Sequence, residues 1–376
     1  MGTVKKGSET AKPTIERLKA DYAAAKNAIA ALLSQKNDKS AHSDSDRTAL
    51  RRAYLSAAHL AKALSERVAD YDLQEAYRDD FLKLSDAAGR YGSVYKSKIP
   101  DTTFDDVKGL AEVKRLIDNF IFIAQNESLV EDYNLQGGLG VLMYGPPGTG
   151  KTMMAEAIAN AMKLPLFIIT PADIYKSYVG ESEQAVKAIF EELEFCEDGA
   201  ILFIDECESI FSRRTADTKD YKAAVTTELL QRMNGFGVSG AKRIIIAATN
   251  RPDEIDPAYL RFKRFSYQIY IDLPDAEAKA AIIHDKIPPA GLAPDITEEM
   301  ILQMTTEPGK YYSAADICGI IEDACMRAIA EMQQKKLEKA IPLSREMIES
   351  AFKANPPRLT EAALRMYKNF RLDNLK

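Results

Sequence analysis

The chain has 376 residues, of which 46% are hydrophobic and 28% charged, and its formal net charge is -6. This length is enough for two or three hydrophobic cores, and the acidic balance disfavours non-specific binding to nucleic acid. No apolar run approaches the ~18 residues of a transmembrane helix, and the N-terminal Met-Gly-Thr-Val-Lys-Lys lacks the apolar region of a secretory signal. The four cysteines form no C-x-x-C pair, which favours free thiols in a reducing compartment. We therefore expect a cytoplasmic protein.

The N-terminal part of the chain is predicted to be helical. Residues 1–12 are polar, and we expect a disordered tail there. Three amphipathic segments follow, at about residues 13–35, 47–70 and 73–89, each with apolar residues at helical spacing. Their short connections predict a small antiparallel bundle within residues 13–97. A coiled-coil arm is the alternative, although no heptad register persists.

From residue 103 the pattern changes to short apolar strands that alternate with helices. The expected strands are residues 141–144, 166–170, 200–204, 244–248 and 267–271. This alternation predicts an α/β fold with a doubly wound parallel sheet and helices on both faces. The strands stop after Pro274, so we expect a large α/β subdomain at 98–274. A smaller helical lid and a last helix at 360–370 follow within 275–376.

A glycine-rich loop follows the first of these strands. Residues 145–152, Gly-Pro-Pro-Gly-Thr-Gly-Lys-Thr, match the phosphate-loop pattern between a strand and an Ala-rich helix. In such loops backbone N–H groups face an anion at a helix N-terminus. A chance match in a glycine-rich loop is the competing interpretation. The motif predicts that a nucleoside triphosphate contacts Gly145, Pro146, Pro147, Gly148, Thr149, Gly150, Lys151, Thr152 and Met153.

Polar residues at two later strand ends complete the predicted chemistry. Asp205 and Glu206 follow strand 200–204, and Asn250 follows strand 244–248. With the Thr152 hydroxyl, Asp205 is expected to hold Mg²⁺. Glu206 can act as general base toward the attacking water. The Asn250 carboxamide can orient this water, although Thr-Asn is by itself also an ordinary turn signal.

Together these motifs resemble the AAA family of ATPases. The resemblance spans about residues 103–370, and it is closest to the group that includes valosin-containing protein, proteasomal ATPases, katanin and the vacuolar-sorting ATPases. The matching segments, in order, are 104–110, 145–152, 205–206, 248–252, 256–265 and 312–317.

The resemblance implies further contacts around the nucleotide. The backbone at Val107 and Gly109 would contact the adenine, His284 would stack near the base, and Ala314 with Ala315 would lie at the adenine edge. A lone histidine is more often structural, which is the competing interpretation. For this family the implied cofactors are ATP and Mg²⁺.

The resemblance also implies a ring, most simply a homohexamer. Arg261 and Arg264 match two arginines that reach into the neighbouring subunit's site, where such a group is worth roughly 10³–10⁵ in rate. A surface pair of basic residues is the competing interpretation. Tyr178 and Val179 match the loop that lines the central pore and grips polypeptide, with Lys176 at its rim; alone, Tyr178 would read as a packed core residue.

The expected function is therefore a Mg²⁺-ATP-dependent ring ATPase. It would remodel, disassemble or unfold protein substrates through a central pore, and the N-terminal helices would recruit substrates or an adaptor. Three alternatives remain open: the ATPase partner of a separate protease, a nucleotide-gated scaffold, and a nucleic-acid remodeller. The sequence contains no H-E-x-x-H motif, which disfavours a zinc protease in this chain.

Overall fold

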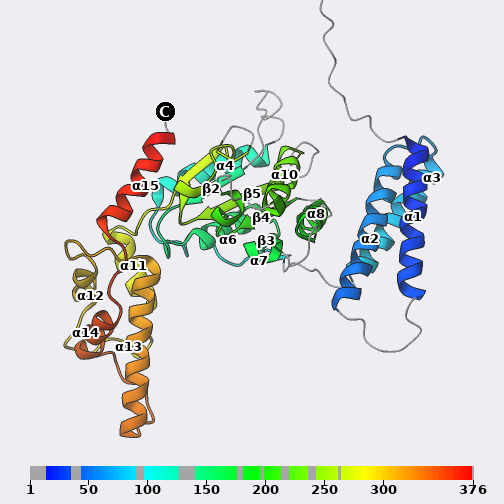
Figure 1. Cartoon of the computed structure of the whole chain (residues 1–376). Coiled ribbons are helices and arrows are strands. Elements are labelled where there is room, and N and C mark those ends of the chain that lie inside the picture. The colour runs from blue at the N-terminus through cyan, green and yellow to red at the C-terminus, as the bar shows by residue number, and fades with distance from the viewer. Residues whose placement is uncertain are drawn as a thin grey trace, which may run out of the picture. The chain divides into compact units, whose positions relative to one another are not determined.

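The computed structural model describes most of the chain in two compact units (Figure 1). The predicted tail at residues 1–12 lies outside the described residues. The ranges that the structure describes are 14–34, 44–89, 97–126, 140–175, 181–194, 196, 199–212, 220–235, 243–260 and 264–374.

The first unit is a bundle of three helices, as predicted. These are α1 (Ile15–Ser34), α2 (Asp44–Ser65) and α3 (Tyr71–Gly89). Small residues such as Ala57 and Ala61 are fully buried in its core and let the helices approach closely. Tyr22 of α1 donates a hydrogen bond of 2.5 Å to Asp80 of α3. The first and third helices are therefore joined directly, which favours the bundle over a coiled-coil arm.

The second helix of this bundle ends earlier than the sequence predicts. The pattern extends a helix to residue 70, but α2 ends at Ser65. Asp70 instead accepts a hydrogen bond of 3.1 Å from the backbone of Leu73, which caps the start of α3. The side chain of Gln74 donates to the Val68 carbonyl at 2.6 Å and fixes the turn between them.

The second unit contains a six-stranded sheet of order β1-β3-β4-β5-β2-β6. Strands β2 to β6 are parallel, as predicted, and β1 adds an antiparallel edge to β3. Every residue of β2 and β4 is buried, which requires cover on both faces of the sheet. The strands are β1 (Ser97–Lys98), β2 (Gly140–Tyr144), β3 (Leu166–Ile169), β4 (Ala200–Ile204), β5 (Arg243–Thr249) and β6 (Tyr267–Tyr270).

Helices follow these strands and line the core. Phe120, Met154 and Ile158 pack on the sheet residues Phe203 and Ile246. The helices of this part are α4 (Ala111–Gln125), α6 (Lys151–Met162), α7 (Pro171–Ile174), α8 (Glu181–Glu194), α9 (Glu208–Phe211) and α10 (Asp220–Gly235), with a short 3-10 turn η1 (Pro252–Glu254).

The remaining helices form a lid with its own core. Ile283, Tyr312, Ile320 and Ile348 are at its centre, each at most 2% exposed. The lid helices are α11 (Ala276–Lys286), α12 (Glu298–Thr305), α13 (Ala314–Lys335) and α14 (Arg345–Ala354). Among the described residues, no helix combines the length and apolar character that crossing a membrane requires.

The last helix, α15 (Glu361–Asn374), packs on the sheet rather than in the lid core. The ring of Phe370 meets Tyr144 of β2 with centroids 4.8 Å apart. Tyr367 stacks on Tyr270 of β6 at 6.3 Å. Helix α15 is thereby attached to β2, which leads into the phosphate loop, and to β6, which pairs with β2.

Two glycines of this unit are expected to respond oppositely to alanine. Gly319 lies exposed within α13, and a Cβ there meets no atom within 4 Å. Gly319→Ala should therefore raise the free energy of unfolding by roughly 0.5–1 kcal/mol, because alanine loses less backbone entropy. A Cβ at Gly140 would lie 2.0 Å from the Arg264 carbonyl oxygen. Gly140→Ala should therefore lower the free energy of unfolding by about 1–3 kcal/mol. Urea unfolding without nucleotide measures both, and shifts of the same sign would contradict this packing.

Candidate functional site

The loop between β2 and α6 has the conformation that its glycines allow. Gly148 and Gly150 have φ values of 74° and 92°, which other residues rarely adopt. A Cβ at Gly145 would lie 2.1 Å from the Ile271 carbonyl oxygen, and so only glycine fits. The first turn of α6 receives no side-chain cap at Gly150. Its backbone N–H groups therefore form a cradle for an anion.

Lys151 is buried at the start of α6, with 7% of its surface exposed. Its ammonium donates hydrogen bonds to the carbonyls of Gly145, at 3.0 Å, and Pro146, at 2.7 Å. Burial lowers the pKa of Lys151 to about 8, although the carboxylates of Asp205 and Glu208 act to raise it. An anion in the cradle would supply the counter-charge that the buried ammonium needs.

The acidic pair follows β4 in a strained turn. Glu206 has a φ of 49°, unusual for a residue with a side chain, and its backbone N–H donates to the Asp205 carboxylate at 2.9 Å. Cys207 N–H donates to the Ala248 carbonyl at 3.0 Å, which ties the turn to β5. Asp205 is half-buried and Glu206 is exposed. The two carboxylates thus meet different surroundings, as the separate roles predicted for them require.

Asn250 lies next to the phosphate loop, at the end of β5. The Thr249 carbonyl accepts a 3.3 Å hydrogen bond from Gly145 N–H, and the Thr249 hydroxyl accepts one of 2.9 Å from Arg251 N–H. The side-chain oxygen of Asn250 is buried and has no hydrogen-bond partner among the described residues. A buried amide oxygen in this state is available to a ligand or a water.

A cavity of about 190 Å³ lies beside the phosphate loop, between the sheet subdomain and the lid. Apolar side chains such as Val107, Met153 and Ile282 line it, a composition that suits a flat organic ring. The other lining residues are Asp106, Lys108, Leu110, Thr149, Gly150, Asp272, Pro274, Asp285, Lys286, Ala314 and Cys318.

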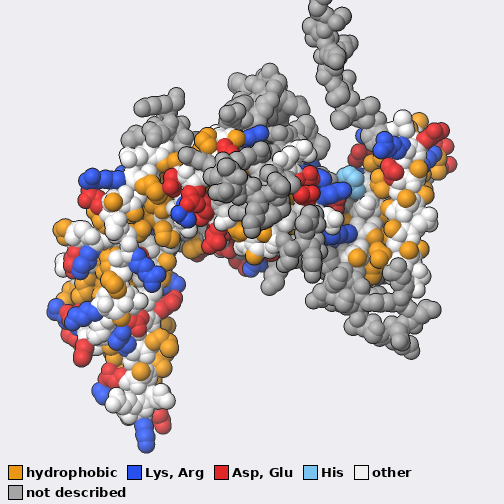
Figure 2. All heavy atoms as spheres, viewed as in Figure 1, with side chains coloured by type: hydrophobic (Ala, Val, Ile, Leu, Met, Phe, Trp, Pro, Cys, Tyr) orange, Lys and Arg blue, Asp and Glu red, His pale blue; other side chains and the backbone are white. Residues whose placement is uncertain are grey.

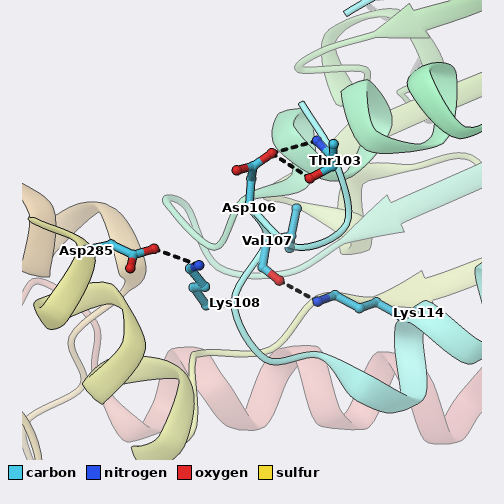
Figure 3. Close-up of polar contacts among 6 residues, drawn as sticks. All are labelled: Thr103, Asp106, Val107, Lys108, Lys114 and Asp285. Carbon is cyan, nitrogen blue, oxygen red and sulfur yellow. Dashed lines mark hydrogen bonds and ion pairs between the residues drawn. The ribbon is translucent and has the colours of Figure 1, made fainter. Parts of the chain in front are cut away.

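One wall of the cavity is the segment 104–110, which is held at both ends (Figure 3). Asp106 accepts hydrogen bonds from Thr103, at 2.7 Å from its backbone and 2.8 Å from its hydroxyl, and these lower the pKa of Asp106. Lys114 of α4 donates to the Val107 carbonyl at 2.5 Å. On the lid side, Lys108 pairs with Asp285 of α11 at 2.6 Å. This ion pair joins the two subdomains across the cavity.

The lid also contacts the phosphate loop directly. Ser313 and Asp316 form a capping box at the start of α13, with bonds of 2.8 and 3.2 Å. Ala315 N–H donates to the Gly148 carbonyl at 3.0 Å. A Cβ at Gly148 would lie 2.7 Å from the Ser313 hydroxyl oxygen. Ala314 thus lines the cavity and Ala315 contacts the loop, while their contact with an adenine stays a prediction.

Other predicted residues are less well situated. Gly109 packs against Ala278 of α11, which a Cβ would meet at 2.7 Å. The His284 side chain is 74% exposed and lies 3.3 Å from the Glu298 carboxylate, so its position lends no support to stacking on a base. Arg264 donates to its own Ala258 carbonyl at 2.5 Å. The roles of these residues stay predictions.

Several predicted residues lie outside the described ranges. They are Arg261 and the pore-loop residues Lys176, Tyr178 and Val179.

The metal ligands can be tested only through their donor set. No group of three His, Cys, Asp or Glu side chains within the described ranges could hold a metal. Mg²⁺ is usually bound through one or two carboxylates and the phosphates of a substrate. Asp205 and the hydroxyl of Thr152, the second residue of α6, fit a Mg²⁺ that arrives with a nucleotide.

Sequence reasoning missed several residues of this site. Lys108, Asp285 and Cys318 line the cavity, and Tyr367 contacts Asn250. Lys108 lies within the matching segment 104–110 but was assigned no role there, and the other three lie outside the matching segments. Lys108 and Asp285 have opposite charges, but only the folded structure shows that they lie next to each other. Tyr367 gave no local signal beyond its place on an apolar helix face.

Comparisons with known proteins identify the family of the chain. The family model described as "ATPase family associated with various cellular activities (AAA)" matches residues 141–273. The cell division cycle protein 48 homolog of Archaeoglobus fulgidus is 35% identical over 257 residues, which are 68% of this chain and 34% of that protein. Vacuolar protein sorting-associated protein 4 of Dictyostelium discoideum is 31% identical over 272 residues, 72% of this chain and 58% of its own length.

A bacterial protein and a solved structure extend the comparison. ATP-dependent zinc metalloprotease FtsH 3 of Symbiobacterium thermophilum is 37% identical over 240 residues, 62% of this chain and 37% of its own length. The crystal structure of the FIGL-1 AAA domain in complex with ADP has a TM-score of 0.61 and 26% identity, covering 75% of this chain and 94% of that one. The chain thus spans about a third to three-fifths of the length of these curated relatives.

The ion pair across the cavity leads to a charge-swap prediction. Lys108→Glu and Asp285→Lys each place like charges opposite one another, so each should speed nucleotide release about two- to fivefold. The double variant Lys108→Glu/Asp285→Lys should restore the slow release, because attraction returns with reversed polarity. Stopped-flow dissociation of a fluorescent ADP analogue measures the rates. Additive losses in the double variant would contradict the pairing.

Proposed function

We propose that this chain, which belongs to the AAA family of ATPases and is an ATP hydrolase, works as a Mg²⁺-dependent ring that remodels, disassembles or unfolds protein substrates. The observation that carries the proposal is the meeting of the phosphate loop, the Asp205-Glu206 turn and Asn250 at one edge of the sheet. The phosphate loop also borders the cavity, which residues of the lid help to line. This edge is where open α/β sheets bind their ligands.

Each residue at this edge has a separate task in hydrolysis. Lys151 exchanges its bonds to the Gly145 and Pro146 carbonyls for the phosphates. Thr152 and Asp205 would hold Mg²⁺, which neutralises phosphate charge when bound. Glu206 takes the proton of the attacking water. The buried amide oxygen of Asn250 can accept a hydrogen bond from this water, and the NH2 group of the same side chain can donate to the terminal phosphate.

The remaining charge in the transition state requires a donor from a second copy. We assign this role to Arg261 and Arg264, supplied by the neighbouring subunit of a homohexamer. In the single chain, Arg264 is bound to its own Ala258 and lies over the Tyr259 ring, 6.0 Å from its centroid. A guanidinium has five N–H donors, so this one bond leaves others for a phosphate of the neighbouring subunit.

The substrate class follows from the relatives and the pore loop. Several matched relatives carry names of protein-handling ATPases, and Tyr178 with Val179 would grip extended polypeptide in the ring's pore. Lys176 would contact it at the rim. The bundle α1–α3 would recruit substrates or an adaptor. The scattered cysteines favour a reducing compartment, so we place this activity in the cytoplasm.

The alternatives have less support. Relatives named zinc metalloproteases share the ATPase region with this chain, but its 376 residues contain no H-E-x-x-H motif. On the face seen in Figure 2, basic and acidic side chains of the described residues are interspersed over the lid. Mixed charge of this kind is typical of ordinary solvated surface and does not favour a nucleic-acid remodeller.

A substrate trap tests the proposal. Glu206→Gln keeps the shape of the site but removes the base, so ATP should still bind while turnover falls about 10²–10⁴-fold. Purified from its native cells with ATP, this variant should retain client proteins. The Glu206→Gln/Tyr178→Ala control should lose them, because the ring no longer grips polypeptide.

The other outcomes of this trap contradict parts of the proposal. Near-normal turnover of Glu206→Gln would remove Glu206 as the base. Equal retention of partners by both variants would favour a scaffold that docks them on the N-terminal helices. Capture of nucleic acid instead of protein would favour a nucleic-acid remodeller.

A further inference from the structure

Helix α15 contacts two parts of the catalytic edge, although it comes last in the chain. The Tyr367 hydroxyl donates a 2.7 Å hydrogen bond to the backbone carbonyl of Asn250, 117 residues away in the sequence. One turn later, Phe370 packs against Tyr144, the residue directly before the phosphate loop. Tyr367 is 4% exposed, so water does not compete for this bond.

The bond from Tyr367 completes the fixation of the backbone around Asn250. On the preceding residue, the Thr249 carbonyl is bound by Gly145 of the phosphate loop. On the following residue, the Arg251 N–H is bound by the Thr249 hydroxyl. The amide oxygen of the Asn250 side chain is left buried and unpartnered among the described residues. The surroundings therefore fix the main chain and leave the side chain to a ligand.

A simpler explanation is that Tyr367 only satisfies its own buried hydroxyl, as buried polar groups generally must. Tyr270 of the same aromatic cluster satisfies its hydroxyl locally: it donates to Asp272, two residues further along the chain, at 2.9 Å. Tyr367 instead bonds across the molecule to the residue that follows β5. Burial makes such a bond stronger and its loss more costly.

We propose that Tyr367 is a positioning residue for ATP hydrolysis, which acts by holding the main chain of Asn250 so that its carboxamide faces the terminal phosphate and the attacking water. This inference rests on the proposed role of Asn250. It makes a docked α15 necessary for fast hydrolysis but not for nucleotide binding, because the described residues that line the cavity include none from α15.

Tyr367→Phe tests the role of the hydroxyl while keeping the aromatic packing. One buried hydrogen bond is removed, so kcat should fall about fivefold to tenfold. The KM for ATP and the affinity for an ADP analogue should stay within about twofold of wild type. Tyr270→Phe is the matched control: it removes a hydroxyl from the same cluster without touching Asn250, so kcat should not fall. An unchanged kcat in Tyr367→Phe, or equal losses in both variants, would overturn the inference.

A double-mutant cycle separates positioning from general stability. Asn250→Ala keeps the carbonyl that Tyr367 binds but removes the carboxamide, so in that background Tyr367→Phe should cost no further activity. The same fold loss in both backgrounds would show that Tyr367 does not act through Asn250, and would leave the ATPase assignment intact.

A second readout does not depend on hydrolysis. Hydrogen–deuterium exchange of residues 249–256 without nucleotide should be faster in Tyr367→Phe and unchanged in Tyr270→Phe. Unchanged exchange in Tyr367→Phe would overturn the inference even if the proposed function failed. A chain that exchanges as expected but hydrolyses no ATP would contradict the proposed function alone.

Discussion

The phosphate loop lies so close to two other elements that neither Gly145 nor Gly148 can carry a side chain. Gly145 passes under the Ile271 carbonyl just after β6, and Gly148 lies against Ser313 at the start of α13. A loop enclosed in this way cannot move without moving the sheet edge or the lid. These contacts connect the loop to a lid that has its own hydrophobic core.

Parts of the chain that are far apart in the sequence meet around this loop. The loop follows β2, Asn250 follows β5 and the acidic pair follows β4, while segment 104–110 and α11 contribute to the cavity wall. Strand order brings the first three together, since β2 lies beside β5 and β5 beside β4. The lid and α15 then close the arrangement from the C-terminal side, through Lys108–Asp285 and Tyr367–Asn250. In the proposed function, one chain supplies the groups that hold the nucleotide, while the arginines come from a neighbour.

Sequence reasoning found the elements whose residues repeat a pattern. The run at 200–204 was predicted to the residue, because it is apolar throughout and ends in two acids. The edge strand β1 was missed, since two polar residues carry no periodicity. The end of α2 was placed too late, because the cap at Asp70 competes with a helical pattern that continues past it. Lys108–Asp285 and Tyr367–Asn250 are tertiary contacts and leave no local signal. The resemblance indicates a role for His284 but not the direction of its side chain, which lies next to Glu298.

The central claim is that a nucleotide binds to one chain but is hydrolysed only between chains. The most direct test is to lower the protein concentration and to measure, on the same samples, ATP turnover per chain, nucleotide bound per chain and particle mass. We expect turnover to fall steeply as particles of six chains give way to single chains, while nucleotide binding per chain persists. Turnover that stays constant per chain where only single chains remain would show that the site is complete in one subunit, and would contradict the account.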